Sequence, residues 1–257
     1  MSAPVTCVTH AGVATITLDR PDAKNRLDAE SMALLLEHLR VTAADPDVRV
    51  VVLTGNGTTF CSGADLAGAV AATSGGFASG GTSGLVDVLA AMLDHPKPII
   101  GRVQGHVAGG GNGLVAACDI AVASADARFA FSEVRVGVAP AIISVVCLQV
   151  MHRRDAQELL LTGERASAER VHAAGLVTQV VEAEGLDAAV AAYADQLVQG
   201  GPEAVARTKE LLRRVPAMTR EDAFAWTAEV SAGLFTSAEA REGMTAFLEK
   251  RKPEWAP

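Results

Sequence analysis

The sequence is poor in cysteine, and its four cysteines lie far apart along 257 residues. No C-x-x-C pair and no histidine at zinc-like spacing accompanies Cys7, Cys61, Cys118 or Cys147. We therefore expect neither a disulfide framework nor a metal site, and we interpret the cysteines as small buried hydrophobic residues. Residues 1–4 also lack the basic and then apolar run of a signal peptide, which predicts a reduced, cytoplasmic protein.

Long apolar runs and an excess of positive charge are also missing. The longest nearly apolar stretch, Val138 to Met151, is interrupted by Pro140 and Ser144, whereas a membrane-spanning helix needs about 20 apolar residues. The formal net charge is −8, and a protein that binds nucleic acid through its overall field is expected to carry the opposite sign. We expect neither a membrane nor a nucleic acid as a partner.

The residues that are present have the composition of a globular protein, with 49% apolar and 20% charged residues. Alternating side chains at residues 13–18 predict a half-buried strand, and the apolar run at residues 50–53 predicts a strand buried on both faces. A helix that Asp28 can cap separates the two strands. Strand, helix and strand in this order predict an α/β fold with a parallel sheet. Three further strands are expected at residues 99–103, 119–123 and 177–181.

The chain divides into a predicted α/β body, residues 1–200, and a helical carboxyl-terminal region, residues 201–257. Thr236 and Glu239 have the spacing of a capping box and predict the start of the last helix. The apolar face of that helix needs a surface to bury and carries Ala240, Met244, Phe247 and Leu248. The Gly- and Ser-rich residues 73–84 are expected to form a surface loop.

Two turns that follow predicted strands carry the residues best suited to chemistry. Residues 105–113 contain a run of glycines before a helix, so backbone N–H groups at the helix start can approach an anion or a developing oxyanion. Residues 60–66 also follow a buried strand, and ligands of open α/β sheets collect at such strand ends. Two N–H groups from separate turns on one carbonyl oxygen would form an oxyanion hole, worth about 3–4 kcal/mol per donor. The alternative is a purely structural strand-to-helix turn.

The glycine turn also fits a second motif. Gly111, Gly113 and Ala116 match the G-x-G-x-x-A dinucleotide fingerprint, and Glu133 lies near the distance of a ribose-binding acid. That fingerprint belongs to the first βαβ unit of its domain, whereas about a hundred residues of α/β pattern precede it here. Binding of NAD(H) is therefore a hypothesis of lower rank.

Taken together, the two turns resemble those of the crotonase family, the enoyl-CoA hydratases and isomerases. Residues 60–66 match the family pattern F-x-(A/S)-G-A-D-L, and residues 97–111 match K-P-x-I-x-x-V-x-G-x-x-x-G-G-G. Residues 127–133 and the ending at 242–255 extend the resemblance over essentially the whole chain. The resemblance implies a crotonase-like ββα superhelix with a C-terminal helical trimerisation region. It also implies an acyl-CoA substrate and no separate cofactor, because coenzyme A is part of the substrate.

The resemblance assigns roles to individual residues. The amide N–H groups of Ala64 and Gly110 would hold the thioester carbonyl, and Glu133 would move the proton. The residues that would lie near the substrate are Lys24, Arg26, Ser62, Asp65, Leu66, Gly109, Gly113 and Ser132. Phe247 and Lys250 would reach the CoA of a neighbouring subunit, which implies a homotrimer or a homohexamer.

The acids of the site depart from the family pattern. Family hydratases use two glutamates, and Gly113 stands in place of the first, while the second is Glu133, preceded by Ser132 instead of proline. Burial in an apolar acyl site should raise the pKa of Glu133, which suits a general acid/base. Since one carboxylate suffices to move a double bond, isomerisation is an alternative to hydration.

Hydration is nevertheless the first prediction for the reaction. Residues 133–137 and 141–144 resemble those of methylglutaconyl-type hydratases, which accept a glycine at the first acid position. C–C cleavage and thioester hydrolysis, two reactions of the same family, stay open beside isomerisation, as does an acyl-CoA binding protein with little activity. RNA binding, which is known for some members of the family, is disfavoured by the acidic charge.

Overall fold

The computed structural model describes residues 3–64 and 81–257, which form an α/β fold around two sheets. The larger sheet contains, in order across it, β1 (Val5–His10), β2 (Val13–Leu18), β3 (Val50–Gly55), β5 (Ile99–Val103), β7 (Ile120–Ser124) and β10 (Gln179–Val181). The strand β1 pairs antiparallel with β2, and all other neighbours are parallel. The five strands expected from the sequence are therefore confirmed, and β1 is an addition.

The smaller sheet contains four short strands, β4 (Thr59–Cys61), β6 (His106–Ala108), β8 (Arg128–Ala130) and β9 (Arg165–Ser167). The strands β4, β6 and β8 each follow a strand of the larger sheet across a tight corner. At one corner Gly105 has φ +65°, and a Cβ atom there would lie 1.9 Å from the Thr58 carbonyl oxygen. The corners are hydrogen-bonded to one another, since the His106 amide donates to the Thr58 carbonyl (3.2 Å). Because a helix follows each strand pair, the units repeat as ββα, which confirms the expected superhelix.

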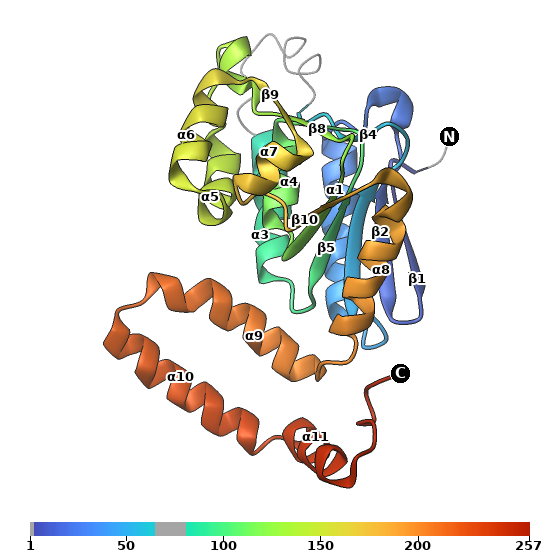
Figure 1. Ribbon diagram of the computed structural model, residues 1–257, viewed down its shortest axis with the longest axis vertical. Coiled ribbons are helices and arrows are strands. Elements are labelled where there is room, and N and C mark those ends of the chain that lie inside the picture. Colours follow the sequence, from blue (N-terminus) through green and yellow to red (C-terminus); the bar gives the residue numbers. More distant parts are fainter. Residues whose placement is uncertain (1–2, 65–80) are drawn as a thin grey trace.

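The helices cover both faces of the larger sheet (Figure 1). Those of the body are α1 (Ala29–Ala44), α3 (Gly81–Asp94), α4 (Gly110–Ala117), α5 (Ala141–Val150), α6 (Arg153–Thr162), α7 (Ala168–Ala173) and α8 (Leu186–Leu197). Three short 3-10 helices accompany them, η1 (Pro21–Ala23), η2 (Ser132–Val136) and η3 (Ala183–Gly185). Asp28 caps α1 as expected, because its Oδ1 accepts the Ser31 amide (2.9 Å).

The helix α4 lies inside the molecule. On one face of the larger sheet, α8 packs Leu186 and Val190 against Val50, Ile100 and neighbouring residues. The other face packs against α1, α3 and α4, and every residue of α4 is buried. A buried helix start that begins with two glycines places its amide groups in a low-dielectric interior, where hydrogen bonds to a charged oxygen are stronger than in water.

The carboxyl-terminal region consists of α9 (Pro202–Arg214), η4 (Val215–Ala217), α10 (Arg220–Phe235) and α11 (Ala238–Glu249). Figure 1 shows these helices as an arm below the body. Arg49 joins arm and body, because its guanidinium donates to the Gly200 (2.6 Å) and Trp255 (3.0 Å) carbonyls. Among residues 3–64 and 81–257, no helix has the length and apolar character needed to cross a bilayer.

Two details of the sequence-based interpretation were wrong. The last helix is capped by Ser237, whose Oγ accepts the Ala240 amide (3.0 Å), because Thr236 still belongs to the end of α10. The Glu239 carboxylate caps a different helix, α9, by accepting the amides of Glu203 (2.8 Å) and Ala204 (2.9 Å). Residues 81–84 of the loop expected at 73–84 are the first turn of α3, and residues 73–80 lie outside the described residues.

Candidate active site

The two turns singled out in the sequence lie against each other. Gly63 has φ +84°, and a Cβ atom on it would lie 2.8 Å from the Ala108 carbonyl oxygen and 3.0 Å from the Gly110 nitrogen. The chain therefore brings Ala64, the next residue, next to the start of α4. Since a side chain at position 63 would push the two turns apart, glycine is required for their contact.

The turn at residues 21–27 completes this arrangement. The Lys24 carbonyl accepts the Ser62 amide (3.1 Å), the Leu27 amide donates to the Gly63 carbonyl (2.8 Å), and Leu27 forms a β-bridge with Ala64. Lys24, Arg26 and Ser62 are thus placed together, as the sequence predicted. The Lys24 side chain is exposed, whereas Arg26 is half-buried and its Nε lies 3.8 Å from the Asp28 carboxylate.

A residue that the sequence analysis missed holds this turn in place. Asn25 is buried, and its Nδ2 donates to the Thr59 (2.6 Å) and Asn56 (2.9 Å) carbonyls at the start of β4. Its φ of +50° is a left-handed conformation that asparagine adopts more readily than most residues. An asparagine in a turn between a strand and a capped helix was the available signal.

The amides of Ala64 and Gly110 have no acceptor among the residues that the structure describes. Within residues 3–64 and 81–257, neither N–H donates a hydrogen bond. Gly110 is the first residue of α4, where the aligned peptide dipoles leave a partial positive charge. The neighbours of Gly110 are apolar, since a Cβ atom there would lie 3.1 Å from Leu27 Cδ1 and 3.3 Å from Leu85 Cδ2. This arrangement can stabilise negative charge on an oxygen atom placed between the two amides.

Glu133 lies beside the same turn. It is in η2, half-buried, and its Oε1 is 3.7 Å from the position that a Cβ atom on Gly109 would take. Its Oε2 is buried and makes no hydrogen bond within the part of the chain that the structure describes. Burial raises the pKa of the Glu133 carboxyl above its usual range, and its own backbone amide partly offsets this. The preceding residue, Ser132, is also half-buried. A carboxyl group in this state can accept and return a proton near neutral pH.

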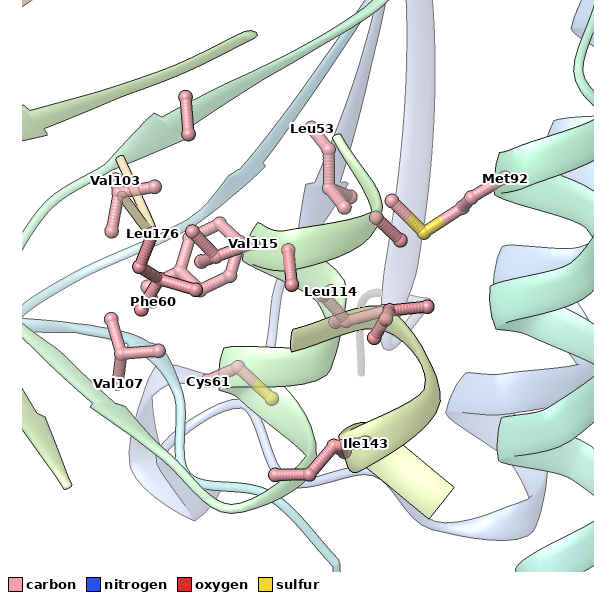
Figure 2. Close-up of a cluster of buried hydrophobic side chains, with 14 of the residues drawn as sticks. Leu53, Phe60, Cys61, Met92, Val103, Val107, Leu114, Val115, Ile143 and Leu176 are labelled. Atoms are coloured by element: carbon pink, nitrogen blue, oxygen red, sulfur yellow. The ribbon is translucent and has the colours of Figure 1, made fainter. Parts of the chain in front are cut away.

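Apolar groups fill the space beside Gly113. A Cβ atom on Gly113 would lie 2.6 Å from Ile143 Cγ2 and 3.6 Å from Leu89 Cδ1. Figure 2 shows Ile143 and Cys61 among the buried side chains that surround Leu114 of α4. A second carboxylate at position 113 therefore has no room unless Ile143 moves.

Four of the predicted site residues are not seen at these turns. Phe247 and Lys250 are exposed, the first at the end of α11 and the second just after it. Figure 1 shows α11 at the end of the molecule far from β4 and β8. Within one chain these two residues are therefore remote from Glu133. Asp65 and Leu66 lie outside the described residues.

Comparison with known proteins agrees with this geometry. The family model described as enoyl-CoA hydratase/isomerase matches residues 8–257. The (E)-benzylidenesuccinyl-CoA hydratase of Thauera aromatica is 34% identical, over 97% of this chain and 98% of its own. The carnitinyl-CoA dehydratase of Citrobacter koseri is 34% identical over 96% of this chain and 95% of its own. The solved structure of an enoyl-CoA hydratase from Mycobacterium smegmatis has a TM-score of 0.94 and 37% identity, with 99% of each chain covered.

The raised pKa of Glu133 makes a prediction about stability. The buried carboxyl should carry no penalty below the usual carboxyl pKa of about 4.3, because it is then protonated in both the folded and the unfolded state. The penalty grows as the pH rises from that value toward the raised pKa of the folded state, and it is constant above it. We therefore expect the Tm of Glu133→Gln, relative to that of the wild type, to increase between about pH 4 and pH 8. A Tm difference that does not change with pH would contradict the burial of the charge.

Proposed function

The chain belongs to the enoyl-CoA hydratase/isomerase family and is an enzyme that acts on acyl-CoA thioesters, and from this premise we propose how its residues act. The reaction is the addition of water to a 2-enoyl-CoA. The thioester carbonyl oxygen accepts hydrogen bonds from the amides of Ala64 and Gly110, and Glu133 transfers the proton. Names of relatives support this assignment, since a hydratase and a dehydratase are among them.

The proposed chemistry needs one carboxylate that acts twice. Glu133 removes a proton from water while the water oxygen bonds to C3 of the enoyl group, and the electron pair of the double bond moves toward the thioester oxygen. Negative charge grows on that oxygen, where the two amides stabilise it by about 3–4 kcal/mol each. Protonated Glu133 then gives its proton to C2. The product is a 3-hydroxyacyl-CoA, and Glu133 is a carboxylate again.

One observation carries this proposal: the carboxyl of Glu133 lies beside Gly109, the residue before the Gly110 amide. The general base in η2 therefore lies beside the turn that carries the Gly110 amide, so a short acyl group can contact both. The raised pKa of Glu133 supports its second task, because a carboxyl that is too acidic returns a proton slowly.

Migration of the double bond is the second candidate reaction, and a specific contact favours it. Ile143 occupies the space beside Gly113, so no second carboxylate can hold the attacking water there. In isomerisation Glu133 would take a proton from C2 of a 3-enoyl-CoA and return it to C4, with no water involved. The apolar side chains of Leu89 and Ile143 suit this reaction because they exclude water, and they can also contact an apolar acyl chain.

The finer identity of the substrate is a proposal. From the sequence we predict that the substrate is like that of methylglutaconyl-type hydratases and that the enzyme takes part in fatty acid metabolism. We also predict that it is cytoplasmic and needs no cofactor. The dinucleotide hypothesis is less well supported, because Gly111 packs against the protein itself. A Cβ atom on Gly111 would lie 2.6 Å from the Cys61 carbonyl oxygen, so this glycine serves the contact between the two turns.

Assembly into a homotrimer, or into a hexamer of two trimers, is proposed from the carboxyl-terminal arm. The helices α10 and α11 leave large apolar side chains uncovered, with Phe224 71%, Leu248 79% and Phe247 82% exposed. Monomeric proteins rarely leave such patches in contact with water. Packing of the arm against another copy would cover them and would bring Phe247 and Lys250 of one subunit to the CoA of the next.

Turnover of a panel of 2-enoyl- and 3-enoyl-CoAs tests the proposed function, with products identified by mass. We expect Glu133→Gln to lower kcat about 100-fold or more, with acyl-CoA affinity changed less than about threefold, because the amide keeps the shape but transfers no proton. The control is Glu184→Gln, a change at an exposed glutamate in η3. Activity of Glu133→Gln within a few-fold of the wild type would remove Glu133 from the mechanism.

Restoring the missing acid tests the choice between hydration and isomerisation. Gly113→Glu alone should lower the free energy of unfolding by about 1–3 kcal/mol, because the new side chain overlaps Ile143. The double variant Gly113→Glu with Ile143→Ala has the space. We expect it to form more hydrated product, relative to isomerised product, than Ile143→Ala alone, which supplies the space without the acid. A folded, acyl-CoA-binding double variant with the same product ratio as that control would count against the two-acid argument.

Sedimentation tests the proposed assembly. We expect a trimer or a hexamer at micromolar concentration, and we expect Lys250→Ala to assemble normally but to bind CoA about tenfold more weakly, which corresponds to the loss of one charge-assisted hydrogen bond. The neighbouring change Lys252→Ala is the matched control. A compact monomer with full turnover would refute a site shared between subunits.

A further inference from the structure

Asn112 is a polar residue in an otherwise apolar helix. It lies in the first turn of α4, its side chain is completely buried, and the other residues of the helix are glycine, alanine, valine and leucine. Its Nδ2 donates to the Ala130 carbonyl (2.8 Å). Its Oδ1 is buried and has no hydrogen-bond partner within residues 3–64 and 81–257. A buried amide with an unsatisfied oxygen costs stability, so packing alone would favour an apolar residue here.

The Ala130 carbonyl, which accepts the hydrogen bond from Asn112, connects the segment of the oxyanion donor with the segment of Glu133. The Ala130 oxygen also accepts the amide of Gly109 (3.2 Å), and Ala130 is paired with Ala108 across β6 and β8. On one side of this carbonyl, Gly109 leads directly to the Gly110 amide at the start of α4. On the other side, Ala130 lies three residues before Glu133. The Ala130 carbonyl oxygen therefore accepts two hydrogen bonds from the turn and helix that carry the Gly110 amide. These two bonds connect that amide to the segment that carries Glu133.

We propose that Asn112 is a positioning residue that fixes the η2 segment, and with it Glu133, relative to the amides of the oxyanion site. This inference rests on the function proposed above. Asn112 does not contact the substrate, and it acts through Ala130. Without its Nδ2, the Ala130 carbonyl keeps one donor, Gly109, and the start of η2 can move relative to α4. A displacement of about 1 Å between a base and its substrate can lower the rate about 100-fold.

Replacement by leucine separates positioning from packing. Leucine has the same branched shape as asparagine and is apolar, so Asn112→Leu should fold with a Tm close to that of the wild type while removing the donor to Ala130. We expect kcat to fall about 10- to 100-fold with KM changed less than about threefold. Val115→Ala is the matched control: it removes buried apolar atoms of α4 and keeps the Asn112 side chain that donates to Ala130, and its kcat should stay within about threefold of the wild type.

Amide hydrogen exchange of Gly109 gives a readout that needs no substrate. We expect exchange at Gly109 to be about tenfold faster in Asn112→Leu than in the wild type or in Val115→Ala, because the shared acceptor is held less firmly. If Asn112→Leu does not fold, Asn112→Ala, which removes the donor and adds no atoms at this buried position, is used with the same expectations.

Two results would overturn the proposal: a kcat of Asn112→Leu within about threefold of the wild type, or unchanged exchange at Gly109. Failure of the proposed function is distinguishable from both, because the wild type would then turn over no 2-enoyl- or 3-enoyl-CoA. In that case amide exchange at Gly109 alone tests the positioning role of Asn112. Faster exchange in Asn112→Leu than in the wild type supports a role of Asn112 in fixing η2 relative to α4, and unchanged exchange refutes it.

Discussion

The close contact between two backbone turns is the constraint on which the site depends. Gly63 approaches the Gly109–Gly110 turn so closely that no side chain fits between them, and Gly111 approaches Cys61 in the same way. The contact needs β4 and β6 side by side, which in turn needs the tight corners that lead from the larger sheet to the smaller one. The glycines thus bring the turn that ends at Ala64 against the start of α4, and within residues 3–64 and 81–257 the amides of Ala64 and Gly110 donate no hydrogen bond. The main contribution of the fold to the site is the placement of these backbone groups, and Glu133 is the one reactive side chain proposed there.

Burial strengthens the Gly110 amide and the single carboxylate, whereas Ala64 is exposed in the part of the chain that the structure describes. Leu27, Leu85 and Leu89 surround the turns with apolar groups, and the same low dielectric that raises the pKa of Glu133 strengthens a hydrogen bond to a developing oxyanion. Ile143 closes the position where a second acid would stand. The site therefore has one proton carrier beside two amide donors, and the choice between adding water and moving a double bond depends on what else can enter beside Gly113.

Much of this could be predicted from the sequence, because the informative signals were local. Alternation and apolar runs located five of the six strands of the larger sheet and missed β1, and Asp28 capped its helix as expected. The strands β4, β6, β8 and β9 escaped, since three residues are too few to show a period. Thr236 and Ser237 both fit a cap, and only the end of α10 decides between them. Contacts across the fold, such as those of Asn112 and Ile143, had no local signal.

A crystal structure with a slowly reacting acyl-CoA thioester tests the central claim most directly, through the distances from the thioester oxygen to the nitrogen atoms of Ala64 and Gly110. Both distances should be about 2.7–3.1 Å, with the C2 atom of the acyl group next to the Glu133 carboxyl. A thioester oxygen that contacts neither amide, or an acyl group on the far side of α4 from Glu133, would contradict the account.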